Sequence, residues 1–525
     1  MVEHVLAKDE TRVRFSLAAH NRVNLKYQNL IGKIPREVSH VTTALEKDGF
    51  EAFLVGGCVR DLIMGREPKD WDITTNAKPE QIIELFEKTV YENTFGTVGV
   101  VVARETANGI VSQETRTIEV TPYRMEAKYS DFRHPDEVKF SDKLEDDLKR
   151  RDFTINALAL SSKGSLSDLF DGVKDIKDKT IKTVGEADKR FTEDALRMLR
   201  AIRFALQLNF SVSYEVTESI IKNADLIKKI SQERIRDEFE KIITSANASS
   251  GVIMLQKFGL LKYIIPELEE GIDCEQAGEH IYPVWEHLLH ALQHAADKNW
   301  SLEVRLAALF HDIGKPRTRR IAEPTNNTKK KYTFYGHEVV GARMAKKIME
   351  RLKFSVKETE LVEKLIRSHM FFSDTELITL SAVRRIIAKV GKENIWLLMN
   401  VRECDRVGMK KKEAPYRLRK YFAMIEEALR DPISVGALKI DGKFMIENLK
   451  ITPGPRMGWI LHALLEEVLD DPTKNTVEHL SELAKSLNGL PDGALRALGL
   501  RGKEKKEELE EHEIEKLHEK HGVRK

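Results

Sequence analysis

The sequence predicts an α+β protein that is mostly helical, with a small strand-containing head followed by helical parts. Two observations predict this fold class. Up to about residue 160, short runs rich in Val, Ile and Thr are separated by glycine turns, which is typical of strands. From about residue 175, apolar residues recur at the spacing of amphipathic helices. The 525 residues are too many for one hydrophobic core, so several domains are expected.

The composition narrows the class of protein. A net charge of +2 means that any contact with nucleic acid must come from local patches. The three cysteines, Cys58, Cys274 and Cys404, form no CxxC pair and support neither a disulfide framework nor a zinc ribbon. No apolar run is long enough for a membrane span, and the first residues lack the apolar core of a signal peptide. We therefore expect a cytoplasmic protein without a membrane partner.

The elements of the head follow in chain order. The run "AFLVGG" (52–57) predicts a strand that enters a glycine turn, and "VRDLIMG" predicts a short helix closed by Gly65. The segment "KPEQIIELF" predicts a helix with Pro79 in its first turn. The segments "TFGTVGVVVA" and "TRTIEVTPYR" predict strands. The polar segment 124–137 predicts a loop.

Helical periodicity organises the remainder of the chain. The segment "TEDALRMLRAIRFALQL" predicts one long helix, and "GIDCEQAGEH" predicts a boundary near 271–280. The charged end "RGKEKKEELEEHEIEKLHEK" predicts a solvated helix rather than an RNA-binding arm. The predicted parts are an N-terminal extension (1–27), a head (28–165), a helical neck (166–275), a third helical domain (276–425) and a helical tail (426–525).

The stretch "PKDWDIT" (68–74) suggests a metal site. Residues i and i+2 of a strand point to the same face, so Asp70 and Asp72 are expected side by side. Two like charges so close are costly unless cations lie between them, and two divalent cations are the usual partners. Upstream, "GGCVRD" offers a glycine turn and Arg60 for a phosphate. Together these features indicate two-metal nucleotidyl transfer; the alternative is a carboxylate pair that caps the next helix.

Two basic segments extend this candidate site. In "KRRDFTINALAL", Arg151 is a candidate contact to a triphosphate or an RNA end, and a solvated basic turn is the alternative. In "RFTEDALRMLRAIRF", Asp194 and Arg197 are neighbours on a helix, followed by Arg200 and Arg203. A carboxylate beside a guanidinium complements the amino donor and ring-nitrogen acceptor that cytosine and adenine share. Such a pair would select C and A without a template, whereas the alternative is a plain salt bridge.

Several long motifs, in order over residues 30–270, resemble the class II CCA-adding enzymes, which are tRNA nucleotidyltransferases of the polymerase-β-like superfamily. They are "FLVGGCVRDLIMGREPKDWDITTN", "RRDFTINALAL" and "GEADKRFTEDALRMLRAIRFALQLNF". The resemblance implies a head with a mixed sheet, a neck that holds the incoming nucleotide, and a body and tail that hold tRNA. It implies template-independent addition of CCA to the 3′ end of tRNA from CTP and ATP, with Mg²⁺ at Asp70 and Asp72. The implied nucleotide contacts are Gly57, Arg60, Arg151, Glu193, Asp194, Arg197, Arg200 and Arg203.

Related activities remain as alternatives. Bacterial poly(A) polymerases share this head but read "EDPVRMLRA" where this chain has Ala195 and Leu196. The segment 124–137 disfavours a relative that adds only CC, because such enzymes lack a loop there. An enzyme that adds only A stays open.

A second group of residues resembles the HD phosphohydrolase domain over about 281–410. The dipeptide His311-Asp312 ends the segment "EVRLAALFHD", and imidazoles and carboxylates of this kind bind divalent metals. The resemblance implies that a second divalent metal is bound by His287, His311, Asp312 and Asp405, with His337 and His369 available for another ion. The alternatives are a degenerate HD fold kept as an RNA-binding body, an HD phosphohydrolase whose head binds RNA, and an RNA-binding protein without enzymatic activity.

Overall fold

The computed structural model describes residues 27–92, 96–105, 111–125, 139–276, 280–321, 332–370, 379–409, 415–429 and 435–521. The predicted N-terminal extension lies outside these residues up to 26, and the predicted loop 124–137 does so from 126. The chain forms two compact units, Met1–Arg367 and Ser368–Lys525, and we describe each by itself.

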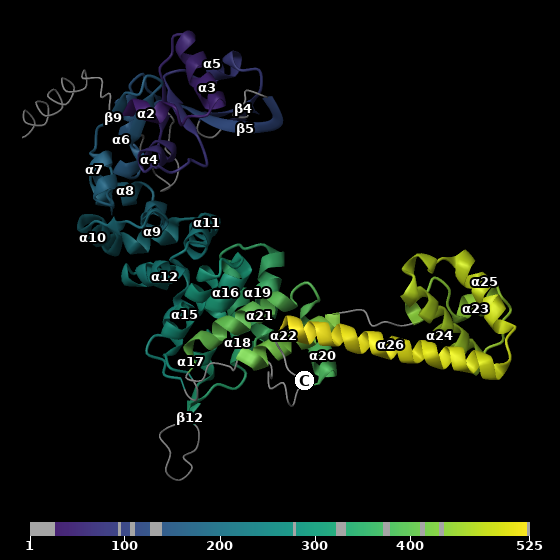
Figure 1. Cartoon of the computed structure of the whole chain (residues 1–525). Helices are drawn as coiled ribbons and strands as arrows, with labels where there is room; N and C mark the ends of the chain where they lie inside the picture. Colours follow the sequence, from purple (N-terminus) through teal and green to yellow (C-terminus); the bar gives the residue numbers. More distant parts are fainter. Residues whose placement is uncertain are drawn as a thin grey trace, which may run out of the picture. The chain divides into compact units, whose positions relative to one another are not determined.

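A seven-stranded sheet organises the head (Figure 1). Strands β2 and β5 pair in parallel and the other neighbours are antiparallel, so the predicted mixed sheet is confirmed. The two segments predicted as strands from their Val and Thr content form the long neighbours β4 and β5. In spatial order the strands are β3 (Thr89–Glu92), β4 (Thr97–Glu105), β5 (Val111–Pro122), β2 (Asp72–Thr75), β1 (Ala52–Val55), β8 (Leu158–Ser161) and β9 (Leu166–Asp168).

Short helices pack around this sheet. The apolar residues Val38, Val41 and Leu45 lie on one face of α3, are fully buried, and belong to the helix that contacts β1 and β4. Pro79 occupies the first helical position of α5, as predicted. The head helices are α2 (Gln28–Ile31), α3 (Arg36–Lys47), α4 (Gly57–Ile63), α5 (Pro79–Leu85), α6 (Leu144–Lys149), η2 (Thr154–Asn156) and α7 (Gly172–Lys177). Two small ladders join β6 (Arg124–Met125) to β7 (Lys139–Phe140) and β10 (Thr180–Ile181) to β11 (Ser211–Val212).

The neck is helical, but its predicted long helix is interrupted. Helix α8 ends at Glu193, Asp194 is extended, and α9 begins at Leu196, so the expectation of one helix over 192–208 is wrong. Helix α9 packs against α11 and α12 through its apolar face. The neck helices are α8 (Ala187–Glu193), α9 (Leu196–Leu208), α10 (Tyr214–Asn223), η3 (Ala224–Lys229), α11 (Gln232–Ile243), α12 (Ala248–Lys257), α13 (Leu261–Ile264) and α14 (Pro266–Glu269).

Further helices complete the first unit. A Cβ on Gly314 would lie 2.4 Å from the His337 carbonyl oxygen and 2.6 Å from the Gly341 nitrogen, so only glycine permits this close approach to α18. The contact brings the residues after α16 against the start of α18. The elements are α15 (Val284–Asp297), α16 (Leu302–Phe310), α17 (Lys315–Thr318), β12 (Arg320–Ile321), β13 (Tyr332–Thr333), α18 (His337–Arg351) and α19 (Val356–Ser368).

The second unit ends in a long helix, α26. A Cβ on Gly499 would lie 2.7 Å from Trp459 Cα, and one on Gly502 would lie 2.2 Å from the His462 carbonyl oxygen. The first part of α26 therefore packs tightly against α24, and its charged later part is the solvated helix that we predicted. The elements are α20 (Leu380–Val390), α21 (Ile395–Asp405), η4 (Arg406–Gly408), α22 (Pro415–Leu429), η5 (Val435–Ala437), α23 (Gly442–Glu447), α24 (Pro455–Asp470), η6 (Pro472–Lys474), α25 (Val477–Asn488) and α26 (Asp492–Lys520). Among all the described helices, none combines the length and apolar character that a membrane crossing requires.

Candidate functional site

The turn between β1 and α4 lies at the centre of the head site. Gly56 has a φ of 81°, which favours glycine. A Cβ on Gly56 would lie 3.1 Å from Arg151 Nη1 and 3.7 Å from Asp72 Oδ2. The backbone of the turn, a guanidinium and a carboxylate therefore meet at one point. These three groups come from segments about 15 and 80 residues apart in the chain, and the pairing of β1 with β2 and β8 brings them together.

The carboxylate pair begins β2 rather than lying within it. Asp72 is the first residue of the strand, and exposed Asp70 precedes it, so our expectation of two strand positions holds for Asp72 alone. Trp71 between them is buried and anchors the segment. Burial raises the pKa of Asp72, the charge of Asp70 raises it further, and Arg151 opposes both. The two carboxylates therefore repel each other, as a site for cations requires.

A third carboxylate, Glu119, escaped the sequence analysis. In the parallel pairing of β2 with β5, Asp72 lies directly opposite Glu119. Glu119 is exposed, although its strand neighbours Ile118 and Val120 are fully buried. An acidic residue in an alternating strand looks like an ordinary surface position in the sequence. Only the register shows that it lies beside Asp72.

The basic residues of the head are held by fixed partners. Arg60 donates to Asn156 Oδ1 at 2.7 Å and to its neighbour Asp61 at 2.9 Å. Arg151 donates to Asp147 at 3.0 Å. Both arginines are thus held in place near the glycine turn, the position in which a triphosphate would meet them.

The neck brings further arginines to the same region. The guanidinium carbons of Arg60, Arg200 and Arg203 lie 5.5, 5.4 and 4.3 Å from the centre of the Phe204 ring. Arg200 also donates two hydrogen bonds to one oxygen of Asp152, at 2.8 and 2.5 Å. Residues of the head and of the neck therefore share one cation-rich site.

The predicted base-reading pair is arranged differently from our expectation. Asp194 and Arg197 do not pair with each other through their side chains, since the helix is broken between them. Arg197 donates instead to Glu193 at 2.7 Å, and Asp194 accepts from Arg234 at 2.7 Å. The two groups remain close in the chain, and the Arg197 N–H donates to the Asp194 carbonyl oxygen at 3.1 Å.

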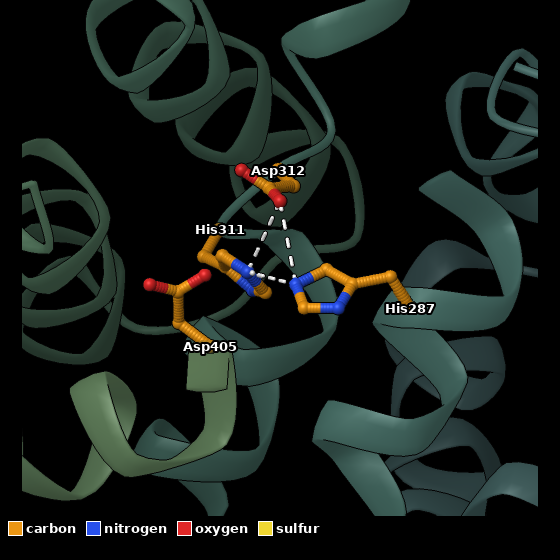
Figure 2. A group of neighbouring side chains, drawn as sticks. All are labelled: His287, His311, Asp312 and Asp405. Carbon is orange, nitrogen blue, oxygen red and sulfur yellow. Dashed lines mark hydrogen bonds and ion pairs between the residues drawn. The ribbon is translucent and has the colours of Figure 1, made fainter. Parts of the chain in front are cut away.

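A second, separate site lies in the helices after the neck. The Nε2 atoms of His287 and His311 lie 3.1 Å apart, and 3.4 and 3.3 Å from Asp312 Oδ2. Figure 2 shows the two imidazoles and the carboxylate pointing toward one another. All three side chains are fully buried, and the Nε2 of His337 lies 3.3 Å from Asp312 Oδ1. Backbone carbonyls orient two of the rings, since Nδ1 of His311 lies 2.8 Å from the Ala308 oxygen and Nδ1 of His337 lies 2.7 Å from the Phe334 oxygen.

The charge of this site is balanced by Lys315. Its Nζ forms an ion pair with Asp312 Oδ2 at 2.5 Å and donates a hydrogen bond to Gln276 at 2.6 Å. Burial alone would raise the pKa of Asp312, but Lys315 and His311 hold it well below its usual range. The carboxylate is therefore ionised, as a metal ligand must be.

Two further predicted ligands belong to the second compact unit. Asp405 and His369 belong to the second unit, where Asp405 accepts from Arg402 at 2.8 Å, so their part in this site stays a prediction. His290 and His294, on the same helix as His287, have aromatic partners of their own: His290 stacks on Tyr282 and His294 packs against Trp300.

Comparisons with known proteins agree with this architecture. Residues 52–182 match the family model of the Poly A polymerase head domain. Residues 209–272 match the model described as the probable RNA and SrmB- binding site of polymerase A, and residues 284–410 match the HD domain.

Relatives match the chain over different lengths. The CCA-adding enzyme of Leuconostoc mesenteroides is 40% identical over 273 residues, which is 50% of this chain and 65% of that enzyme. The first curated relatives align over 48% to 65% of their own length. A crystal structure of the Bacillus stearothermophilus CCA-adding enzyme in complex with CTP covers 86% of this chain and 97% of its own, with 25% identity and a TM-score of 0.55.

One relative matches almost end to end. The CCA-adding enzyme of Ligilactobacillus salivarius is 31% identical over 461 residues, which is 87% of this chain and 98% of that enzyme. The mixed sheet, the glycine turn beside Asp72 and this long match have the same explanation: the chain belongs to the family of CCA-adding enzymes.

Proposed function

We propose that this chain adds CCA to the 3′ end of tRNA from CTP and ATP, without a template, by nucleotidyl transfer. The observation that carries the proposal is the meeting of the Gly56 turn, Arg151 and Asp72 at one point. A glycine turn before a helix presents N–H groups to phosphate, and a guanidinium adds charge-assisted hydrogen bonds. The relatives are named CCA-adding enzymes, which supports tRNA and the two nucleotides as partners. We expect the protein in the cytoplasm.

Asp70 and Asp72 are the residues that would hold Mg²⁺. The pKa of Asp72 is raised by burial and by Asp70, so its ionised form gains from a nearby cation, which fits a hard divalent ion. Bound there, magnesium would favour deprotonation of the attacking 3′ hydroxyl and neutralise the leaving pyrophosphate. Glu119, on the adjacent strand, is our proposal for a third carboxylate.

The remaining residues bind and select the nucleotide. Gly57, Arg60 and Arg151 would hold the triphosphate. Arg200 and Arg203, packed at Phe204, would neutralise the nucleotide and the RNA end. Asp194 would accept from the base amino group, while Arg197, which Glu193 holds, would donate to the ring nitrogen.

Nucleotide addition tests this proposal. Purified protein is incubated with labelled CTP or ATP and with three tRNAs, which end before the first C, after the first C and after both. We expect addition of C, C and A in turn, and its loss in Asp70→Asn and Asp72→Asn. The control Asp48→Asn changes an exposed acid at the end of α3 and should keep full activity. Addition of A alone, or of long A tails, would replace CCA addition by the A-adding or poly(A) polymerase alternative.

The buried His and Asp group supports a second candidate function, metal-dependent phosphoester hydrolysis. Ligand atoms about 2.0–2.1 Å from one ion lie about 3.0–3.4 Å apart. The separations among His287, His311 and Asp312 are 3.1 to 3.4 Å, which fits one divalent ion. We propose that Asp405 supplies a further ligand and that His337 and His369 serve a second ion. Metal analysis of the purified protein, and hydrolysis of cyclic nucleotides, 2′-phosphates and phosphodiesters, test this proposal.

A further inference from the structure

Arg234 holds the carboxylate that is proposed to read the base. Its Nη2 donates to Asp194 Oδ2 at 2.7 Å and its Nη1 donates to Oδ1 at 3.3 Å, so the guanidinium makes a bidentate contact with the carboxylate. The side chains of Arg234 and Asp194 are 24% and 16% exposed, so water weakens this pair less than it weakens a surface pair. The contact joins residues that are 40 positions apart, on α11 and at the end of α8.

One face of α11 carries two such contacts. Glu238 follows Arg234 by one helical turn, and its Oε2 forms an ion pair with Arg203 Nε at 2.8 Å. Helix α11 packs against α9. Its Arg234 pairs with Asp194, and its Glu238 pairs with Arg203. Both partners are among the proposed nucleotide contacts. Two charged side chains of α11 therefore pair with oppositely charged residues that are proposed to contact the nucleotide.

Arg234 holds the Asp194 side chain at the break between two helices. Asp194 is extended, between the end of α8 and the start of α9. Besides Arg234, the Leu196 N–H donates to Oδ1 at 3.0 Å. These described hydrogen bonds use two acceptor sites on Oδ1 and one on Oδ2. Since each carboxylate oxygen has two lone pairs, Oδ2 keeps one acceptor site for an amino group.

Arg197, the other half of the proposed reading pair, is anchored separately. It donates to Glu193, to the Arg190 carbonyl oxygen at 3.2 Å and to the Arg150 carbonyl oxygen at 3.3 Å. Asp194 and Arg197 therefore do not fix each other. Each needs its own support if the spacing between acceptor and donor is to match a base edge.

We propose that Arg234 is a positioning residue for base selection. It fixes the Asp194 carboxylate so that one oxygen accepts from the amino group of cytosine or adenine, and a base with a carbonyl group there is rejected. This inference rests on the proposed nucleotidyl transfer and deepens it. Arg234 acts through Asp194 and need not touch the substrate.

Single-turnover addition of each of the four nucleotides tests the inference. We compare two variants. Arg234→Met keeps most of the length of the side chain but removes its charge, and Arg234→Lys keeps the charge but cannot bind both carboxylate oxygens as the planar guanidinium does. The matched control is Arg236→Met, on the same helix, whose guanidinium pairs with Asp237 and Glu240 instead. Circular dichroism and melting curves establish that each variant is folded.

We expect Arg234→Met to lower the preference for CTP over UTP by roughly tenfold, because a charge-assisted contact to the reading group is lost. The KM for CTP should rise more than kcat falls, Arg234→Lys should recover part of the preference, and Arg236→Met should match the wild type. An equal fall in the rates for all four nucleotides, with selectivity unchanged, would make Arg234 a structural residue and overturn the inference.

A double-mutant cycle separates this inference from the function on which it rests. In an Asp194→Ala background, Arg234→Met should cause no further loss of selectivity, because the group that it positions is gone. If Asp194→Ala itself keeps full selectivity, the proposed base reading is wrong. If Asp194→Ala loses selectivity and Arg234→Met does not, base reading stands and the role of Arg234 is refuted.

Discussion

Asp72 on β2 and Glu119 on β5 are direct partners in the parallel register, so their side chains project from the same face of the sheet. Asp72 also lies beside the Gly56 turn, which places Glu119 near the position proposed for the reacting phosphate. A third carboxylate at this position would add negative charge to the proposed cation site. It would also orient any water or ion that Asp72 binds.

We predict that Glu119→Gln lowers the rate of nucleotide addition by at least about tenfold, because one charge-assisted contact at the site is lost. Binding of tRNA should not change. The rate should recover in part at higher Mg²⁺ concentration if the carboxylate assists metal binding. The control is Glu114→Gln, since Glu114 is five residues away in the same strand and points to the opposite face. Equal rates for Glu119→Gln and the wild type would remove Glu119 from the site.

The second prediction concerns Gly56. An alanine there would adopt a φ of 81° and a ψ of −134°, which costs on the order of 1–3 kcal/mol, and its Cβ would press against Arg151 Nη1. Gly65→Ala is a matched control, because Gly65 also has a positive φ, but a Cβ added to it would meet no other atom within 4 Å. We expect both variants to lose similar stability in thermal melts, while only Gly56→Ala shows a strongly raised KM for CTP. A similar KM in the two variants would show that the turn does not serve the nucleotide.

The sequence could predict those parts of the site that depend only on residues close together in the chain. The glycine turn, the strand with Asp72 and the helix after Pro79 follow from local propensity and spacing, and the structure has all three. Glu119 and Arg234 could not be found in this way, because each reaches the site through a partner about 40 or more residues away. The break at Asp194 was also missed, since the apolar spacing continues through it and only the backbone shows the interruption.

The third prediction is that the two sites work independently. His311→Gln with Asp312→Asn should remove bound divalent metal and any hydrolase activity, because two of the proposed ligands are lost. Addition of CCA should stay within about twofold of the wild type, because mutations at distant, independent sites change each other's free-energy effects by only about 0.3–0.5 kcal/mol. His290→Gln serves as the control, because that ring stacks on Tyr282 instead. If a folded double variant fails to add CCA, the HD region is needed for tRNA synthesis.

The last prediction uses the pH dependence of the Asp152–Arg200 pair. Burial would raise the pKa of Asp152, but Arg200 lowers it to about 2. An unfolded Asp titrates near pH 4, so the folded protein binds this proton more weakly than the unfolded chain does. The pair therefore stabilises the protein above about pH 4, and the stabilisation is lost as the pH falls toward 2.

We expect Asp152→Asn to lower the free energy of unfolding by about 2 kcal/mol at pH 7, and by progressively less below pH 4. Urea unfolding midpoints of variant and wild type at pH 7, 5, 4 and 3 measure this difference. Asp188→Asn is the control, because its partner Lys222 is 69% exposed, and a surface pair contributes less than about 1 kcal/mol. A difference for Asp152→Asn that is constant from pH 7 to pH 3 would mean that packing, and not the charge of Asp152, accounts for the loss.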